Sequence, residues 1–125
     1  MNNDTRRTSV LIVEDEIEFR FLLRVVLDRV AGCEVVAESV DCADAIVQAA
    51  AHQPGLIFLD VHMPKGNGLH AVEQIDRASP RSTVIVMSSD PETRIPATRM
   101  GLRWVDKARL MRELPGILER APASG

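Results

Sequence analysis

Polar side chains of a few reactive types follow short apolar runs of this sequence. They are Glu14, Asp15, Asp60, Ser88 and Lys107. Carboxylates that are brought close together repel one another, and a hard divalent cation is the simplest relief of that repulsion. A small set of oxygen ligands, with room for water and a phosphate, suits Mg²⁺ better than zinc, which prefers cysteine or histidine. We therefore expect a magnesium site formed by the three acidic residues.

Asp60 is the residue around which this chemistry would be arranged. It ends the run Leu56-Ile57-Phe58-Leu59, which is apolar without alternation, as is typical of a strand buried on both faces of a parallel sheet. An ionised carboxylate at that place is costly unless something compensates it. A bound Mg²⁺ lets an anionic nucleophile approach a phosphoryl group, while a lysine ammonium and a hydroxyl stabilise the equatorial oxygens. The set therefore favours phosphoryl transfer onto Asp60.

Further apolar runs, rich in β-branched residues, predict the strands that must carry these side chains. Strands are expected at residues 10–13, 33–38, 56–60, 83–87 and 102–106. Between the first two, apolar residues recur at helical spacing, which predicts a helix over 16–31 that Gly32 ends. Its apolar stripe includes Leu22, whereas Phe21 and Val25 lie off the stripe and are expected to be exposed.

The other helices are delimited by caps, glycines and prolines. They are expected over 41–53, with Asp41 as the cap, over 69–79 after the turn Gly66-Asn67-Gly68, and over 109–120 with an interruption at Pro115-Gly116. A fourth helix would begin at Asp90-Pro91. Because Pro96 falls inside it, where a proline costs about 3 kcal/mol in a regular interior, we expect this helix to be short or distorted.

Strands that alternate with helices over short connections indicate an α/β fold. The expected architecture is a doubly wound, five-stranded parallel sheet with helices on both faces. In such sheets, ligand sites lie at the carboxyl ends of the strands. The polar residues that follow the strands would therefore gather at one edge of the sheet.

The composition limits the classes of protein to consider. With 125 residues, we expect one domain at 9–120, an N-terminal tail at 1–8 and a tail or linker at 121–125. A net charge of −3 without a basic run argues against direct nucleic-acid binding. No apolar run is long enough for a membrane span and no signal-peptide pattern is present, so we expect a cytoplasmic protein. The cysteines lack metal-type spacing and are expected to be reduced thiols.

The polar residues and their spacing resemble the receiver domain of bacterial two-component response regulators. The matching features are Glu14-Asp15 after the first strand, Asp60-Val-His-Met-Pro64 followed by Gly68, Ser88 after the fourth strand, and Lys107 after Trp104-Val-Asp. The resemblance spans about residues 9–120 and implies the flavodoxin-like strand order 2-1-3-4-5. The sequence departs from the family at Pro96 and at Ala108, where many receivers have proline.

The resemblance implies that Asp60 accepts a phosphoryl group from a histidine kinase or a histidine phosphotransfer protein. Asp15, Asp60 and the backbone carbonyl of His62 would bind Mg²⁺, and Glu14 would assist through a water molecule. Lys107 would pair with the phosphoryl group. Such a domain is a signalling protein rather than an enzyme, although self-phosphorylation from small donors and autodephosphorylation are expected.

The same resemblance implies a switch at some distance from Asp60. Ser88 would reach for a phosphate oxygen, and Trp104 would turn inward and repack the face formed by the fourth helix, the fifth strand and the fifth helix. That face would bind a second copy of the chain or a downstream protein. His62 and Asp90 occupy positions that tune the lifetime of the phosphorylated state in receivers.

Each of these residues also has an ordinary structural role open to it. The acidic residues at 14–16 would stabilise a helix dipole, Lys107 would be a surface lysine, and Trp104 would be a core residue. Ser89 is a second candidate for the hydroxyl, although the spacing favours Ser88. The competing function is a phosphorylation-independent pseudo-receiver that acts as an interaction module, which the altered fourth helix keeps open. A phosphatase is a weaker alternative, because His62 stands where it would need a second acid.

Overall fold

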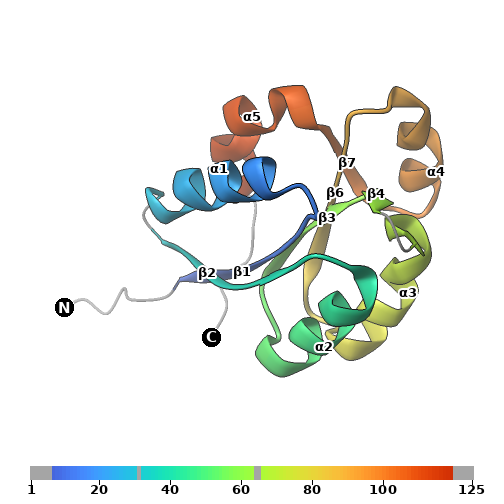
Figure 1. Cartoon of the computed structure of the whole chain (residues 1–125), viewed down its shortest axis with the longest axis horizontal. Coiled ribbons are helices and arrows are strands. Elements are labelled where there is room, and N and C mark those ends of the chain that lie inside the picture. The colour runs from blue at the N-terminus through green and yellow to red at the C-terminus, as the bar shows by residue number, and fades with distance from the viewer. Residues whose placement is uncertain (1–6, 31, 64–65, 120–125) are drawn as a thin grey trace.

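The computed structural model describes residues 7–30, 32–63 and 66–119 (Figure 1). Residues 1–6 and 121–125 of the expected tails, and Pro64 of the Asp60 motif, lie outside the described residues. The main sheet forms one layer between two layers of helices (Figure 1). No described helix has both the length and the apolar character that a bilayer span requires.

The main sheet is parallel throughout and has the strand order that the resemblance implies. In spatial order its strands are β2 (Cys33–Ser39), β1 (Thr8–Val13), β3 (Leu56–Asp60), β6 (Thr83–Ser88) and β7 (Arg103–Asp106). The order is 2-1-3-4-5 when these strands alone are counted along the chain. The flavodoxin-like fold class is therefore confirmed.

Helices cover both faces of the sheet, as right-handed crossovers require. One face packs against α1 (Ile17–Asp28) and α5 (Lys107–Glu119) (Figure 1). The other face packs against α2 (Cys42–His52), α3 (Gly68–Ala78) and α4 (Arg94–Arg99). A short 3-10 helix, η1 (Pro91–Thr93), comes directly before α4. The two faces produce two hydrophobic clusters with the sheet between them.

The strand β3 is buried on both faces, as its unbroken apolar run predicts. Ile57 and Leu59 pack in the cluster that includes α2 and α3, whereas Leu56 and Phe58 pack with α1 and α5. Successive side chains of a strand point to opposite faces, and here both faces are covered. The carboxylate of Asp60 is consequently held at the end of a rigid strand and is only 3% exposed.

The first helix presents a narrower apolar face to the core than its sequence pattern predicts. α1 ends at Asp28 rather than at residue 31, and its buried side chains are Leu23 and Leu27. Leu22, which the pattern placed in the core, is 48% exposed. The helix packs at the edge of the sheet against β1 and β2, and only a narrow stripe of its side chains is buried there. Phe21 is exposed as expected, whereas Val25 is half-buried.

The interruption predicted in the last helix is wrong, since α5 is continuous from Lys107 to Glu119 across Pro115. Proline lacks the N–H that would bond one turn back. However, Leu110, Leu114 and Ile117 are all buried against the sheet. Their packing stabilises the helical conformation on both sides of Pro115, although one backbone hydrogen bond is missing.

The fourth helix is short, as Pro96 predicts, and α4 has only 6 residues. Pro96 lies in the first turn of α4, where backbone N–H groups have no acceptor within the helix, so the proline is tolerated. The side chain of Asp90 accepts a hydrogen bond from the backbone N–H of Glu92 at the start of η1, so a helical segment begins at Asp90-Pro91 as predicted.

The turn predicted at Gly66-Asn67-Gly68 contains regular structure instead. β5 (Gly66–Asn67) pairs with β4 (His62–Met63) in an antiparallel ladder directly after Asp60, and α3 begins at Gly68. Asn67 caps α3, since its side chain accepts a hydrogen bond from the backbone N–H of Leu69 at 2.8 Å. The paired segments are only two residues apart in the sequence, so the pairing is local, but each segment is too short to show a strand period.

Candidate functional site

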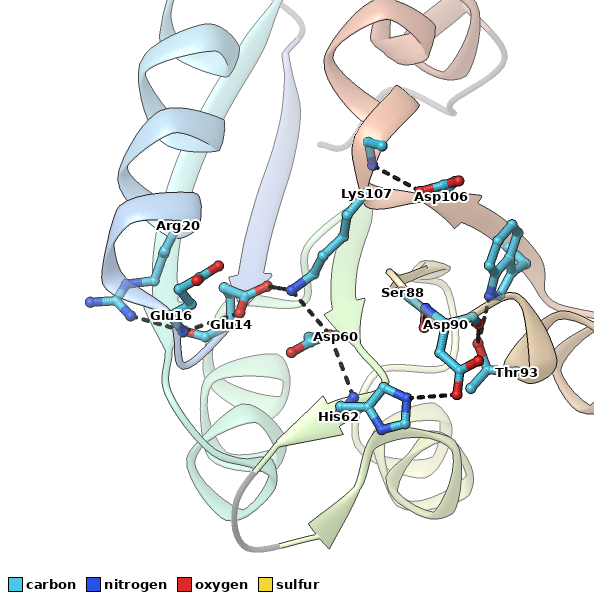
Figure 2. A network of polar contacts seen from close by, with 12 residues as sticks. Glu14, Glu16, Arg20, Asp60, His62, Ser88, Asp90, Thr93, Asp106 and Lys107 are labelled. Carbon is cyan, nitrogen blue, oxygen red and sulfur yellow. Dashed lines mark hydrogen bonds and ion pairs between the residues drawn. The ribbon is translucent and has the colours of Figure 1, made fainter.

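The carboxyl ends of the parallel strands place the polar residues at one edge of the sheet (Figure 2). Glu14 and Asp15 follow β1, Asp60 ends β3, Ser88 ends β6, and Lys107 begins α5 directly after β7. Because Val13 of β1 lies beside Leu59 of β3, the residues that follow them also become neighbours. The loops add little freedom, since each side chain starts within a residue or two of a sheet strand.

The acidic side chains form a compact cluster. One carboxylate oxygen from each of Glu14, Asp15 and Asp60 lies within 4.8 Å of the others. Glu14 is 0% and Asp60 is 3% exposed, whereas Asp15 is exposed to solvent. Glu14 and Asp60 therefore form the buried part of the cluster, and Asp15 forms its solvent-exposed part.

Lys107 is the cation that the structure places in this cluster (Figure 2). Its Nζ atom lies 2.7 Å from Glu14 Oε1 and 3.3 Å from Asp60 Oδ1. Among residues 7–30, 32–63 and 66–119, Glu14 Oε1 nevertheless makes no hydrogen bond of good geometry, although it is buried. Within the described part of the chain, one ammonium thus contacts two carboxylates of a three-acid cluster, and one buried carboxylate oxygen is incompletely satisfied. An all-oxygen donor set with this excess of negative charge fits Mg²⁺.

The ionisation of the buried groups reflects the same imbalance. Burial raises the pKa of Asp60, and the Lys107 ammonium only partly opposes the rise. Burial likewise raises the pKa of Glu14; the ammonium opposes this rise too, whereas the neighbouring Asp60 charge adds to it. Burial alone would lower the pKa of Lys107, but its contacts with Glu14 and Asp60 outweigh burial and raise that pKa. Added positive charge would therefore favour the ionised form of both carboxylates.

Ser88 faces the loop that follows β6 and is fully buried, whereas Ser89 is exposed. The Ser88 hydroxyl donates to the backbone carbonyl of Asp90 at 3.3 Å and accepts from the backbone N–H of Asp90 at 2.9 Å. The Asp90 carboxylate lies 3.6 Å from Nε2 of His62, whose backbone N–H is 3.4 Å from Asp60 Oδ1 (Figure 2). These contacts link the end of β6 to the end of β3.

The sequence model of the response regulator receiver domain matches residues 10–108, which is most of the chain and includes every residue of this cluster. The chain belongs to the response regulator receiver family. The resemblance to receivers that the spacing of the acidic residues, Ser88 and Lys107 indicated is therefore confirmed.

The share of a relative that this chain spans varies from about a quarter to about two thirds. This receiver domain is 31% identical over 80 residues to the chemotaxis protein CheY of Thermotoga maritima, a match that covers 64% of this chain and 66% of CheY. It is 34% identical over 86 residues to a protein-glutamate methylesterase/protein-glutamine glutaminase of Geobacter sulfurreducens, and that match covers 69% of this chain but only 24% of the relative. The crystal structure of the response regulator domain of Thermotoga maritima CheB superposes with a TM-score of 0.82 at 25% identity, covering 93% of this chain and 96% of that domain.

Trp104 of this receiver domain is half-buried on β7 and makes a hydrogen bond to η1. Its indole Nε1–H donates to the hydroxyl of Thr93 at 2.9 Å, and the Arg94 guanidinium lies 5.9 Å from its ring centroid. The Thr93 hydroxyl in turn donates to the backbone carbonyl of Asp90 at 2.7 Å. Ser88 and Thr93 therefore share one acceptor, which connects the end of β6 to Trp104.

Three further residues contact the site residues, although nothing in the sequence indicated a role for them there. They are Phe19, Arg20 and Thr93. Arg20 donates from Nη1 to the backbone carbonyl of Glu14 at 2.9 Å and from Nε to Glu38 at 3.1 Å, which fastens the loop after β1 to β2. Each of these contacts joins segments that are distant in sequence or lie in an irregular loop, so no local spacing could have indicated them.

Proposed function

We propose that this receiver domain is a phosphoacceptor whose Asp60 carboxylate receives a phosphoryl group from a histidine kinase or a histidine phosphotransfer protein. The observation that carries the proposal is the cluster of Glu14, Asp15 and Asp60 oxygens within 4.8 Å, with the Lys107 ammonium 3.3 Å from Asp60. Phosphoryl transfer needs positive charge around the moving group more than it needs covalent help. A divalent cation on the acids and the ammonium of Lys107 would supply that charge.

The acids of the cluster would hold Mg²⁺ through Asp15, Asp60 and the backbone carbonyl of His62, with Glu14 acting through water. When bound, the ion neutralises phosphoryl oxygens and lowers the repulsion between two anions. An Asp60 carboxylate oxygen forms a bond to phosphorus as the phosphorus–nitrogen bond of the donor phosphohistidine breaks, and the imidazole nitrogen keeps the electron pair. Lys107 moves from Asp60 Oδ1 to a phosphoryl oxygen.

The switch begins when the Ser88 hydroxyl leaves the carbonyl of Asp90 and donates to a phosphoryl oxygen. This change disturbs the acceptor that Thr93 also uses, and Thr93 is the partner of the Trp104 indole. Trp104 then turns inward and changes the face formed by α4, β7 and α5, which would bind a second copy or a downstream protein. The contact between His62 and Asp90 lies beside the phosphorylated carboxylate and would tune its hydrolysis.

Phosphorylation of Asp60 is tested with a small donor. Incubation with Mg²⁺ and acetyl phosphate is expected to add one hydroxylamine-labile phosphoryl group to the intact protein, as measured by mass spectrometry, and to change the fluorescence of Trp104. Asp60→Asn should lose both responses, whereas Asp76→Asn, an exposed acid on α3, should keep them. If saturating donor and Mg²⁺ leave the protein unmodified, the pseudo-receiver becomes the better explanation.

The exposed apolar side chains of α1 are the proposed contact for the kinase. Ile17 is 67%, Phe21 is 66% and Leu22 is 48% exposed, on the helix that follows the Glu14-Asp15 loop. We expect Phe21→Asp to slow phosphotransfer from the cognate kinase by about tenfold, as the loss of one apolar interface anchor would. The rate with acetyl phosphate should not change.

Val47→Asp is the matched control for this prediction, because Val47 is 61% exposed but lies on α2, away from the loop. It should leave both rates unaltered. Equal slowing by Phe21→Asp and Val47→Asp, or slowing with acetyl phosphate as well, would argue against docking on α1.

A further inference from the structure

An aromatic ring faces the ammonium of the site. Lys107 Nζ lies 4.7 Å from the centroid of the Phe19 ring, on α1. Phe19 is half-buried and packs against the hydrophobic cluster between α1, α5 and the sheet. None of the acid, metal or switch roles described above uses it.

The ammonium has partners of two kinds. Glu14 Oε1 at 2.7 Å and Asp60 Oδ1 at 3.3 Å attract it as charges, while the ring of Phe19 attracts it through its negative face. Lysine has a long flexible stem, so a point charge at its end needs contacts on several sides to stay in one place. The ring supplies a third contact in addition to the two carboxylates.

We propose that Phe19 is a positioning residue, whose ring holds the Lys107 ammonium beside Asp60 and so prepares it to receive a phosphoryl oxygen. The inference rests on the proposed phosphoacceptor function. It adds a residue whose contribution comes from the electrons of its ring rather than from its volume.

The burial of this contact makes the ring's attraction significant. The Lys107 side chain is only 14% exposed, and cation–π attraction is strongest where water is excluded. The ring also lacks a directed acceptor atom. It therefore keeps the ammonium near Asp60 while leaving it free to exchange a carboxylate oxygen for a phosphoryl oxygen. An aliphatic side chain would fill the same space without attracting the charge.

The test is a series of fluorinated phenylalanines placed singly at position 19 of the full chain. Successive fluorination weakens the negative face of the ring and changes its size little. We expect the logarithm of the phosphorylation rate with acetyl phosphate and saturating Mg²⁺ to fall steadily along the series. The trifluorinated ring should react about three- to tenfold more slowly than the natural one.

The same series placed at Val47 of α2, which is 61% exposed, is the control and should leave the rate unchanged. Phe19→Tyr should keep the rate and Phe19→Leu should lower it. The chain has only two lysines, Lys65 and Lys107, so an NMR spectrum of protein with isotope-labelled lysine can detect the contact between Lys107 and the ring directly. The side-chain protons nearest the Lys107 ammonium should show an upfield ring-current shift that Phe19→Leu removes.

Normal phosphorylation with a flat series at position 19 would overturn the positioning role and leave the proposed function intact. Absence of the ring-current shift in the unmodified protein would overturn it as well. Failure of the unmodified protein to become phosphorylated would overturn the proposed function itself, and the positioning role with it.

Discussion

Replacement of Gly68 by alanine is expected to abolish phosphorylation of Asp60 and to lower the free energy of unfolding by about 1–3 kcal/mol. A Cβ atom at this position would lie 2.4 Å from the backbone oxygen of Asp60 and 3.1 Å from Cα of Val61. Both are main-chain atoms, which cannot rotate away as a side chain would. The first residue of α3 and the peptide that carries the reactive carboxylate would have to separate.

Separation disturbs the site because Gly68 also holds the chain after Asp60. Its backbone N–H donates to the carbonyl of Val61 at 2.9 Å. Moving the Asp60 peptide shifts the carboxylate relative to Asp15 and Lys107, and a misplacement of about 1 Å is enough to cost about a hundredfold in rate. Chemical denaturation measures the stability, and mass spectrometry with acetyl phosphate measures the modification.

Gly32→Ala provides the matched control. Gly32 has a φ of 87°, and among the described residues that are not its chain neighbours no atom lies within 4 Å of an added Cβ, so alanine there meets backbone strain of roughly 1–2 kcal/mol without a clash from those residues. We expect Gly32→Ala to be destabilised yet phosphorylated at the normal rate. Normal phosphorylation of Gly68→Ala would show that the close approach of α3 to Asp60 does not hold the reactive geometry.

Without Mg²⁺ at neutral pH, Asp60→Asn is expected to be more stable than the natural protein by about 1–2 kcal/mol, or several degrees in Tm. The Asp60 carboxyl is 3% exposed, and burial raises its pKa despite the opposing charge of Lys107. Asparagine removes one of two buried acids that share a single ammonium. The remaining pair, Glu14 and Lys107, is balanced in charge.

The sign of the pH dependence follows from the raised pKa. The folded protein binds the Asp60 proton more tightly than the unfolded chain does, so this group stabilises the fold fully below the unfolded pKa and progressively less as pH rises through the folded pKa. The advantage of asparagine should therefore be largest at neutral pH and should disappear on acidification to about pH 4. Mg²⁺ should stabilise the natural protein and not the variant.

Thermal unfolding followed by Trp104 fluorescence between about pH 4 and pH 8 measures this difference. Glu113→Gln, which removes an exposed acid from α5, should change the Tm little at any of these values. A variant Asp60→Asn that melts below the natural protein at neutral pH without Mg²⁺ would contradict the assignment of Asp60 as an incompletely compensated buried charge.

Much of the candidate site follows from the way parallel strands end. The unbroken apolar run before Asp60 indicated a strand covered on both faces, and Glu14-Asp15 and Lys107 were placed by the runs that precede them. Because parallel strands bring their carboxyl ends to one edge, these local patterns were sufficient to predict that the acids and the ammonium meet. The strand order and the individual roles of the residues depended on the resemblance to receivers.

The sequence by itself determined where strands and helices form and which reactive residues follow the strands, because periodicity and end signals act over a few neighbouring residues. Tertiary structure alone decided that α5 continues through Pro115 and that Leu22 is exposed. It also decided that the Phe19 ring faces Lys107 and that Thr93 holds Trp104. The physical reason is the same in each case: the deciding contact is made with another segment, and its energy exists only after the chain has folded.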